Sequence, residues 1–494
     1  MMRILNGAAR ALPLLGLLGL GACNDFLDVN TNPNAAETAN IEIRLPALIT
    51  QFIHSSYYGE TSLWGSEWTQ QFSFNRDSRS YGQVQRYEIS ENTGSSAWDY
   101  LYSRPGAGAN SMIKDATGPN DGYYRGLGYL FRAWTFQILT DHWGPVPYTQ
   151  AFDPAIREPK YDDQKVVYAG ILTDLDSAVA LLSATTGRRP TANDLLYGGD
   201  VTKWVKLARF LQARANLRIS GAPGEDKTAR ANKALAALAG ALTGNADDAD
   251  FIYTGGSGAR SPLYTFYDLR GQFVAAQTMV EALKARSDPR IGILFTPIPY
   301  DSIRGTGTAR VTYPAKPNTF VGMQEGQSTL NDSTVSWIAS YYSGDTTRTN
   351  VVSYADQKFT EAEARLIVTG AADADAPYRD GIRAHMQKLG VPAAAITAYV
   401  DARPALSTLA NPLEEIITQK WIANFLKVEP WNDWRRTGYP VLTPVANALL
   451  PGIPQRIRTP GSELSNNINQ VMATGIPTGL EGEMVKVWWA GGTK

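Results

Sequence analysis

The sequence contains almost no cysteine, with Cys23 as the one thiol among 494 residues. Secreted proteins that depend on disulfides carry several cysteines, usually an even number, so a disulfide framework is excluded. Histidine is also scarce, and His54, His142 and His385 are scattered without paired spacing. Catalytic zinc sites usually cluster two or three histidines with a carboxylate. We therefore expect no metal and no cofactor.

The sequence also lacks an excess of charge of either sign, with 46 Lys and Arg against 47 Asp and Glu. Nucleic-acid-binding domains usually have a basic face, so nucleic acid is not an expected partner. No stretch marks the pair of carboxylates that a glycoside hydrolase needs, and the strand–helix alternation of a barrel enzyme is missing. We expect a protein that is not an enzyme. The alternatives are a secreted glycan-degrading enzyme and a surface scaffold that binds no ligand.

The N-terminus has the anatomy of a secretory signal. Arg3 and Arg10 precede a short apolar run at residues 11–21, and the segment ends Leu20-Gly21-Ala22-Cys23. The run is shorter than the ~20 residues that a membrane-spanning helix needs. Its last four residues resemble the bacterial lipobox, which implies lipidation of the Cys23 thiol and cleavage before it. We expect residues 1–22 to be a signal peptide and residues 23–36, which are polar and turn-rich, to be a lipidated tether; the alternative is an ordinary signal peptide with a chance cysteine.

Apolar residues at helical spacing are the dominant pattern after the tether. They predict helices at residues 121–142, 164–183, 202–219, 226–242, 275–286, 355–368, 377–388, 393–402 and 411–426. The last of these has a strong start signal, with Asn411 as the cap, Pro412 at the first position and Glu414 three residues after the cap. Neighbouring helices joined by short turns suggest hairpins like those of tetratricopeptide repeats, although no clean repeat consensus is present.

Four long stretches interrupt the helical pattern, at residues 59–94, 250–272, 297–349 and 441–494. They are rich in Gly, Pro, Ser, Thr and aromatic residues, and loops of this length are commonly functional. No inter-domain linker is evident after the tether. We therefore expect residues 37–494 to form a single, mainly helical ligand-binding domain with long irregular loops.

Aromatic residues are abundant, with 12 Trp, 24 Tyr and 15 Phe. Aromatic planes beside Arg, Asn and Asp can bind sugars or peptides, because the rings stack on apolar faces and the polar groups bind hydroxyls or amides. Residues 64–81 combine both, and the candidate ligand-binding residues there are Trp64, Trp68, Phe74, Arg76, Arg79 and Tyr81. Trp64 and Trp68 also fall at helical spacing, so core packing is the alternative for them.

A second candidate group is Trp337, Tyr341 and Tyr342, which lie in a loop rich in Ser, Thr, Gly and Asp, where exposure is expected. A weaker group comprises Phe266, Tyr267, Arg270 and Gln272. The block Trp431-Asn432-Asp433-Trp434-Arg435-Arg436 favours a structural role instead, because Arg–aromatic stacking is common without a ligand.

The residues after Cys23, Asp25-Phe26-Leu27-Asp28, resemble the mature start of SusD/RagB-type outer-membrane lipoproteins. Further blocks agree with that family in the same order: residues 141–148 (DHWGPVPY), 194–220, 288–290 (DPR), 429–440 (EPWNDWRRTGYP) and 454–458 (PQRIR). Two departures are Thr459-Pro460, where the family has Tyr-Pro, and the altered surroundings of the Ala-Glu-Ala helix at residues 361–364.

This resemblance implies an all-α core of tetratricopeptide-like helix pairs. It also implies an outer-membrane lipoprotein, held at the cell surface by the lipid on Cys23. Members of the family cover SusC-like TonB-dependent transporter barrels, to which they deliver captured oligosaccharides or peptides, and they are not enzymes.

Overall fold

The computed structural model describes residues 40–57, 59–75, 82–89, 91–184, 186–256, 258–264, 273–298, 302–304, 311–313, 319–327 and 334–494. The expected signal peptide, the tether with Cys23, and the candidates Arg76, Arg79 and Tyr81 lie outside these residues. The weaker candidate group at residues 266–272 lies outside them as well.

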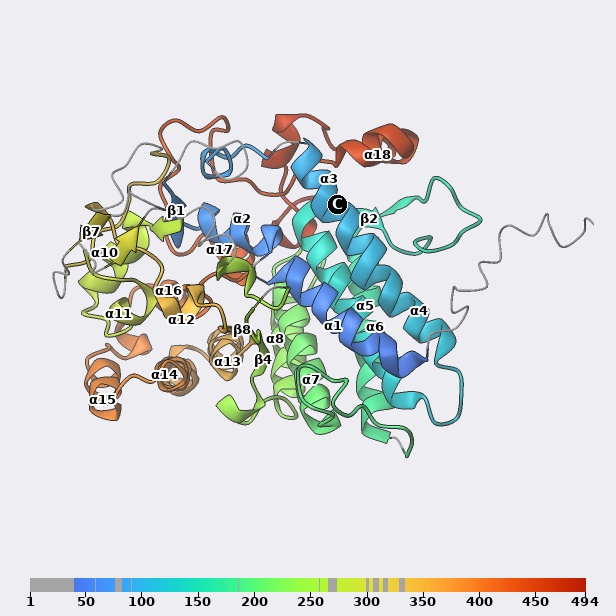
Figure 1. Ribbon diagram of the computed structural model, residues 1–494, viewed down its shortest axis with the longest axis horizontal. Helices are drawn as coiled ribbons and strands as arrows, with labels where there is room; N and C mark the ends of the chain where they lie inside the picture. Colours follow the sequence, from blue (N-terminus) through green and yellow to red (C-terminus); the bar gives the residue numbers. More distant parts are fainter. Residues whose placement is uncertain are drawn as a thin grey trace, which may run out of the picture. The chain divides into compact units, whose positions relative to one another are not determined.

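Helices make up most of the described chain (Figure 1), which confirms the expected mainly helical class. Their bounds are α1 Ile41–Ser56, α2 Glu60–Trp68, α3 Glu91–Leu101, α4 Ala107–Asp115, α5 Gly122–Trp143, α6 Gln164–Ala184, α7 Val201–Arg218, α8 Lys227–Leu238, α10 Gln277–Ala285, α11 Ile291–Leu294, α12 Ser340–Ser343, α13 Tyr354–Val368, α14 Ala371–Lys388, α15 Ala393–Asp401, α16 Pro412–Ala423, α17 Glu429–Thr437, α18 Gly461–Asn466 and α19 Ile468–Ala473.

Three helix bounds differ from the sequence prediction by three residues or more. Helix α8 ends at Leu238 rather than at residue 242. Helix α14 begins at Ala371, after Gly370 with φ +95°, and so contains Pro377 in its interior rather than at its start. Helix α16 begins as predicted, since the Asn411 side chain accepts a hydrogen bond from the Glu414 N–H. It ends early, at Ala423, because the following connection turns through Leu426 with φ +64°, a conformation uncommon for a bulky residue.

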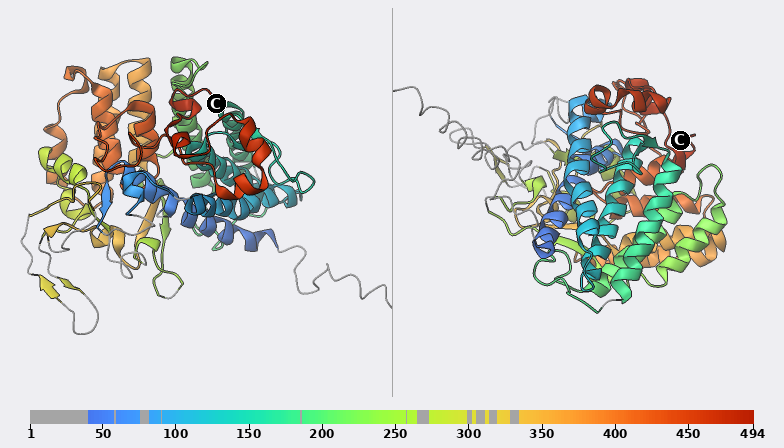
Figure 2. Two further views of the ribbon diagram at one scale, coloured as in Figure 1. Left: turned by 90° about the horizontal axis from the view of Figure 1, so that it is seen from above. Right: turned by 90° about the vertical axis from the view of Figure 1, so that its right-hand side faces the viewer.

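The helices pack in a continuous array. Helix α5 packs against α4 and α6, α6 against α7, and α7 against α8. The chain after α8 forms loops and short strands before the next long helix, α13. Helix α8 packs against α13, which in turn packs against α14 and α16. Figure 2 shows the orange helices of this second group beside the green helices α7 and α8. Stacked antiparallel helix pairs of this kind are the tetratricopeptide-like scaffold that was expected.

The described strands form short antiparallel pairs, and most of these strands lie between α8 and α13. Strand β4 (Ala249–Ile252) pairs with β8 (Arg348–Val352), and Asp250 lies opposite Asn350. Strand β1 (Phe72–Phe74) pairs with β5 (Phe273–Ala275), so that Phe74 lies opposite Phe273. Two further pairs are β2 (Val146–Pro147) with β3 (Tyr161–Asp162), and β6 (Ser302–Arg304) with β7 (Val311–Tyr313).

Two large hydrophobic clusters form the interior of residues 41–494, which make up one compact unit. One contains the buried faces of α1 to α7 together with Trp431 and the C-terminal Trp488 and Trp489. The other contains residues of α10 to α16 and of β1 and β5. The two clusters meet where α7 packs against α13 and where α17 packs against α16.

Helix α6 is long and apolar enough to cross a membrane by length and composition alone. It packs between α5 and α7 and buries Val167, Ile171 and Leu175 among them. Its hydrophobicity is therefore explained by its position in the helical array.

Candidate ligand-binding site

Helix α17 has a structural role, as its sequence predicts. The guanidinium carbon of Arg435 lies 3.5 Å from the ring centroid of Trp431 and 4.7 Å from that of Trp489. Arg435 also donates to the backbone oxygens of Asp141 and Gln455, at 2.6 and 3.0 Å. It thus joins the end of α5 to the C-terminal segment, and its buried position leaves no open face for a ligand.

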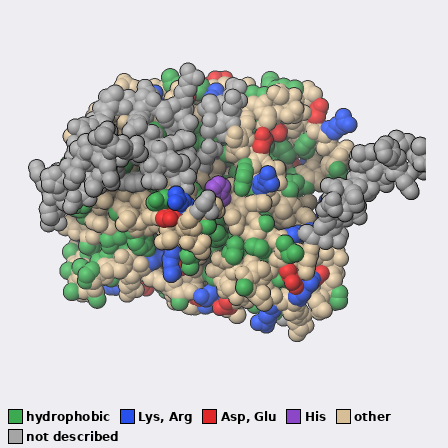
Figure 3. All heavy atoms as spheres, in the orientation of Figure 1, with side chains coloured by type: hydrophobic (Ala, Val, Ile, Leu, Met, Phe, Trp, Pro, Cys, Tyr) green, Lys and Arg blue, Asp and Glu red, His purple; other side chains and the backbone are tan. Residues whose placement is uncertain are grey.

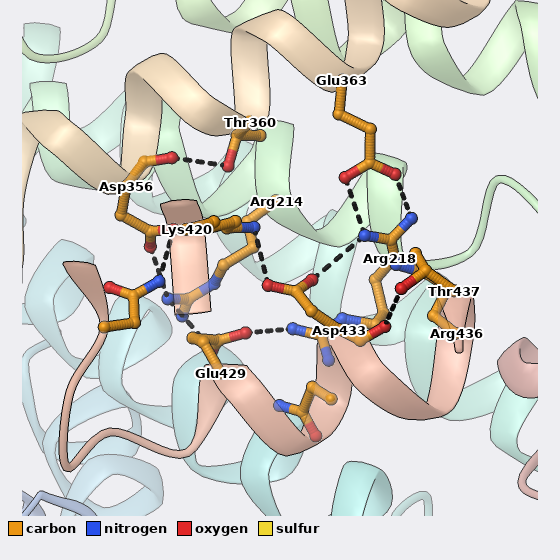
Figure 4. A network of polar contacts seen from close by, with 12 residues as sticks. Arg214, Arg218, Asp356, Thr360, Glu363, Lys420, Glu429, Asp433, Arg436 and Thr437 are labelled. Atoms are coloured by element: carbon orange, nitrogen blue, oxygen red, sulfur yellow. Dashed lines mark hydrogen bonds and ion pairs between the residues drawn. The ribbon is translucent and has the colours of Figure 1, made fainter. Parts of the chain in front are cut away.

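A network of buried charges connects α17 with α7, α13 and α16 (Figure 4). Arg214 pairs with Glu429 at 3.2 Å, Lys420 pairs with Asp433 at 3.0 Å, and Arg436 pairs with Glu363. Burial alone would raise the pKa of Asp433, but Lys420 and Arg436 outweigh it and lower the pKa to about 2. Opposite charges that compensate one another in this way fix the junction between the helix groups.

The structure places Trp64, Trp68 and Phe74 in the core. The exposed fraction of each side chain is 1% or less. The Trp68 indole donates to the Val84 carbonyl and lies 4.8 Å from the Trp431 ring. For the two tryptophans this is the packing that their helical spacing also allows. Phe74 was expected beyond the periodic stretch, but strand β1 extends through it and its ring lies 5.3 Å from that of Phe273.

Exposure was expected for Trp337, Tyr341 and Tyr342, and the structure shows it for Tyr341, with 40% of the side chain exposed. Trp337 is fully buried, because its backbone bridges to Val274 of β5. Tyr342 is 7% exposed, with its ring 5.1 Å from that of Phe425. Among the described candidates, Tyr341 therefore has the most accessible aromatic face.

Tyr341 stands at a cavity of about 290 Å³. The cavity brings together residues from β4, α12, β8, α14 and the connection between α16 and α17, and we refer to it as the Tyr341 cavity. It is lined by Asp250, Tyr341, Tyr342, Arg348, Asn350, His385, Lys388, Leu389, Ala423, Phe425 and Lys427. Its size is near the lower end for small-molecule sites, which occupy roughly 300–1,000 Å³.

The polar groups of the Tyr341 cavity are held in place by one another. The ammonium of Lys388 lies 2.6 Å from Asp248 and 2.7 Å from Asp250. The Asn350 amide donates to Asp250 at 2.7 Å and accepts from Lys427 at 2.6 Å. A ligand would therefore meet an ordered set of donors and acceptors beside an aromatic ring.

Burial keeps His385 neutral. Burial and the nearby Arg290 lower the pKa of His385 well below its usual range. The neutral ring accepts a hydrogen bond from Arg290 at 3.1 Å through Nδ1. His385 is thus occupied by a structural contact. Within the described ranges, no group of three or more His, Cys, Asp or Glu side chains could hold a metal ion.

Sequence analysis missed the charged residues of the cavity. Asp250, Arg348, Lys388 and Lys427 are far apart in the chain, and the packing of β4, β8 and α14 brings them together. A local signal was present at Lys427, which lies in the largely apolar connection Phe425-Leu426-Lys427-Val428. A lysine there is 5% exposed, and buried lysines are rare unless they have a partner.

Comparison with known proteins gives one family. The SusD-like family model described as "Starch-binding associating with outer membrane" matches residues 33–460. A search of curated proteins gave no match.

Solved structures agree with the family match. A SusD/RagB family protein from Bacteroides thetaiotaomicron is 25% identical with a TM-score of 0.79, covering 92% of this chain and 100% of that chain. A chitin-binding protein is 26% identical with a TM-score of 0.77, covering 91% and 100%. A chitin-binding SusD homolog from Flavobacterium johnsoniae is 22% identical with a TM-score of 0.75, covering 90% and 98%, and shares the fold.

Proposed function

The chain belongs to the SusD/RagB family, and we propose that it is an outer-membrane lipoprotein that captures oligosaccharides at the cell surface. It then delivers them to a SusC-like TonB-dependent transporter. The observation that carries this proposal is the family match across residues 33–460, whose description combines starch binding with the outer membrane. The similarity to a chitin-binding protein favours glycans over peptides as ligands.

Tyr341 and Tyr342 form the described part of the proposed binding surface. Tyr341 supplies a ring face for stacking, and the surrounding amide, ammonium and guanidinium groups can bind sugar hydroxyls. Arg76, Arg79 and Tyr81 stay in the proposal as further ligand contacts. The buried Trp64, Trp68, Phe74 and Trp337 are assigned a packing role in the core.

The proposed role is binding without turnover. Asp250 is the one carboxylate that lines the Tyr341 cavity within the described ranges, and it is engaged by Lys388 and Asn350. Both contacts hold Asp250 in a structural role, so it is not proposed as a catalytic acid or base. Retention at the membrane is assigned to lipid on Cys23, with residues 23–36 as the tether.

A scaffold that binds no ligand is the second candidate. It is favoured by the burial of five of the aromatic side chains proposed as ligand contacts, which are Trp64, Trp68, Phe74, Trp337 and Tyr342. Glycan binding distinguishes the two functions. A scaffold would still associate with the transporter, but it would bind no glycan.

The test combines both properties. The protein is purified from native outer membrane in mild detergent, its partners are identified by mass spectrometry, and binding to immobilised glycans and peptides is measured. We expect a TonB-dependent barrel to co-purify and one class of oligosaccharide to bind. A barrel without any bound glycan would support the scaffold, and the absence of both would overturn the proposal.

A further inference from the structure

The Tyr341 cavity carries more positive than negative charge. Among the described residues, its lining contains three cations, Arg348, Lys388 and Lys427, and one carboxylate, Asp250. Asp248 does not line the cavity but contacts Lys388. If Asp248 is included in the count, the described residues supply three cations and two carboxylates. On the face shown in Figure 3, by contrast, Lys and Arg side chains are interspersed with Asp and Glu. The whole sequence is close to neutral, with 46 Lys and Arg against 47 Asp and Glu, so the excess in the cavity is a local feature.

Lys427 is the most unusual of these cations. It is 5% exposed, and among the described residues no carboxylate lies within ion-pair distance of its ammonium. Its one hydrogen-bond partner there is the neutral Asn350, although an ammonium has three donors. The nearby Asp356 is engaged by Asn424 at 3.0 Å and by Lys420 at 3.6 Å. A buried cation without a carboxylate partner is costly unless something compensates its charge.

Arg348 is the second cation available to a ligand. Its side chain is exposed, and no ion pair is formed by it in the described part of the chain. Arg348 and Asn350 are two residues apart on strand β8, so their side chains point to the same face. Asn350 in turn contacts Lys427, and both cations line the same cavity.

The backbone that presents Lys427 is fixed. Leu426 adopts φ +64°, and its N–H donates to the Gln71 side chain at 2.9 Å. An unfavourable conformation persists where the surroundings enforce it, and such positions are frequent at binding sites. The connection therefore holds Lys427 against the cavity instead of allowing it to extend into solvent.

We propose that the Tyr341 cavity recognises a carboxylate-bearing sugar, with the carboxylate bound between Lys427 and Arg348 and the sugar ring against Tyr341. This rests on the proposed function and narrows it to acidic glycans such as chains of uronic acid. Asp250 repels the ligand carboxylate only weakly, because the ammonium of Lys388 lies 2.7 Å from Asp250 and compensates its charge. Asn350 and Asp250 can bind the hydroxyl groups.

The proposal is tested by calorimetric titration of the purified full chain with a trimer of galacturonic acid and with its neutral counterpart, a trimer of galactose. We expect Lys427→Met to weaken trigalacturonate binding about tenfold or more, as loss of a charge-assisted contact should. Lys427→Arg should retain the affinity within about threefold, because the positive charge stays in place. The matched control is Arg383→Gln, an exposed arginine of α14 paired with Asp380, which should leave the affinity unchanged. Thermal unfolding of each variant shows that it is folded.

The outcomes separate the two proposals. Equal affinity of wild type and Lys427→Met for trigalacturonate would overturn the acidic-sugar assignment. Binding of neutral trimers alone would overturn it too, and would leave the oligosaccharide-binding function standing. Binding to neither trimer, nor to any neutral oligosaccharide of starch or chitin, would overturn both. Preference for a short peptide with a free C-terminal carboxylate, lost in Lys427→Met, would assign the carboxylate site to peptides and reject the sugar.

Discussion

The ammonium of Lys427 lies 2.6 Å from the side-chain oxygen of Asn350. Because this partner is neutral, it does little to hold the proton, and burial lowers the pKa of Lys427 to about 8. The charged groups around it are Asp356 of α13, Asp248 and Asp250 of the β4 region, and Lys388 of α14, whose effects partly cancel. A bound carboxylate would favour the protonated lysine.

The affinity for an acidic trisaccharide should therefore depend on pH. The ligand carboxylate stays ionised throughout, whereas Lys427 loses its charge as the pH rises through about 8. We expect calorimetric affinity to be constant between about pH 6 and pH 7 and to fall by about tenfold by pH 9.5. Lys427→Arg should abolish this decline, since arginine stays protonated. A wild-type affinity independent of pH would contradict the role given to Lys427.

Glu67 of α2 should make the fold less stable as pH rises. Its side chain is 4% exposed, and neither carboxyl oxygen has a hydrogen-bond partner in the part of the chain that the structure describes. Burial therefore raises the pKa of Glu67 well above its usual range. The unfolded chain releases this proton near the usual glutamate pKa of 4.5, while the folded chain keeps it. The free energy of unfolding therefore falls as pH rises above that value.

Replacement of Glu67 by Gln should remove this dependence. Chemical denaturation should show Glu67→Gln to be more stable than wild type by about 1–3 kcal/mol at pH 7, with little difference near pH 4. Glu281→Gln, at an exposed position of α10, is the control and should change neither value. A loss of stability in Glu67→Gln at pH 7 would indicate that the carboxylate has a favourable partner.

Arg435 should be essential to the stability of the C-terminal region. Its replacement by Ala removes the stacking on Trp431 and leaves the carbonyls of Asp141 and Gln455 without their donor. We expect a loss of about 3 kcal/mol or more in the free energy of unfolding. Arg383→Ala, which removes an exposed pair, should cost no more than about 0.5 kcal/mol. Comparable losses in the two variants would show that the buried stack contributes little.

Cys23 should determine location and leave binding unaffected. Cys23→Ser removes the proposed lipid attachment, and one acyl chain contributes about 0.8 kcal/mol of membrane affinity per buried methylene. Fractionation should find the variant released from the membrane, with the glycan affinity of the purified protein unchanged. A variant that stays in the membrane fraction would show that another element anchors the chain.

The fold could be predicted further than the site. Helices α5, α6 and α7 begin and end within one residue of their predicted ranges. Their apolar residues recur at helical spacing from the first turn to the last, so the sequence marks both ends. The first turns of α14, with the sequence AADADA, carry little of that pattern, and its start was therefore placed too late.

The site depends on contacts between distant segments. Phe74 lies past the periodic helical stretch and Trp337 lies in a polar loop, so both were proposed as ligand contacts. Pairing with β5 buries both, and no local sequence pattern predicts that pairing. Lys427, Asn350 and Lys388 meet only after β8 and α14 have packed. Tyr341 was the candidate that could be recognised, since its neighbours are polar and its ring stays accessible.

The function proposed for this protein is the binding of oligosaccharides without their cleavage. Its most direct test is calorimetric titration of the intact wild-type protein with oligosaccharides of starch, chitin and galacturonic acid, followed by chromatography of the recovered ligand. We predict saturable binding of one of these series, weakened about five- to tenfold in Tyr341→Ala by loss of stacking, with the ligand recovered intact. Absence of binding to every series, or recovery of shortened products, would contradict it.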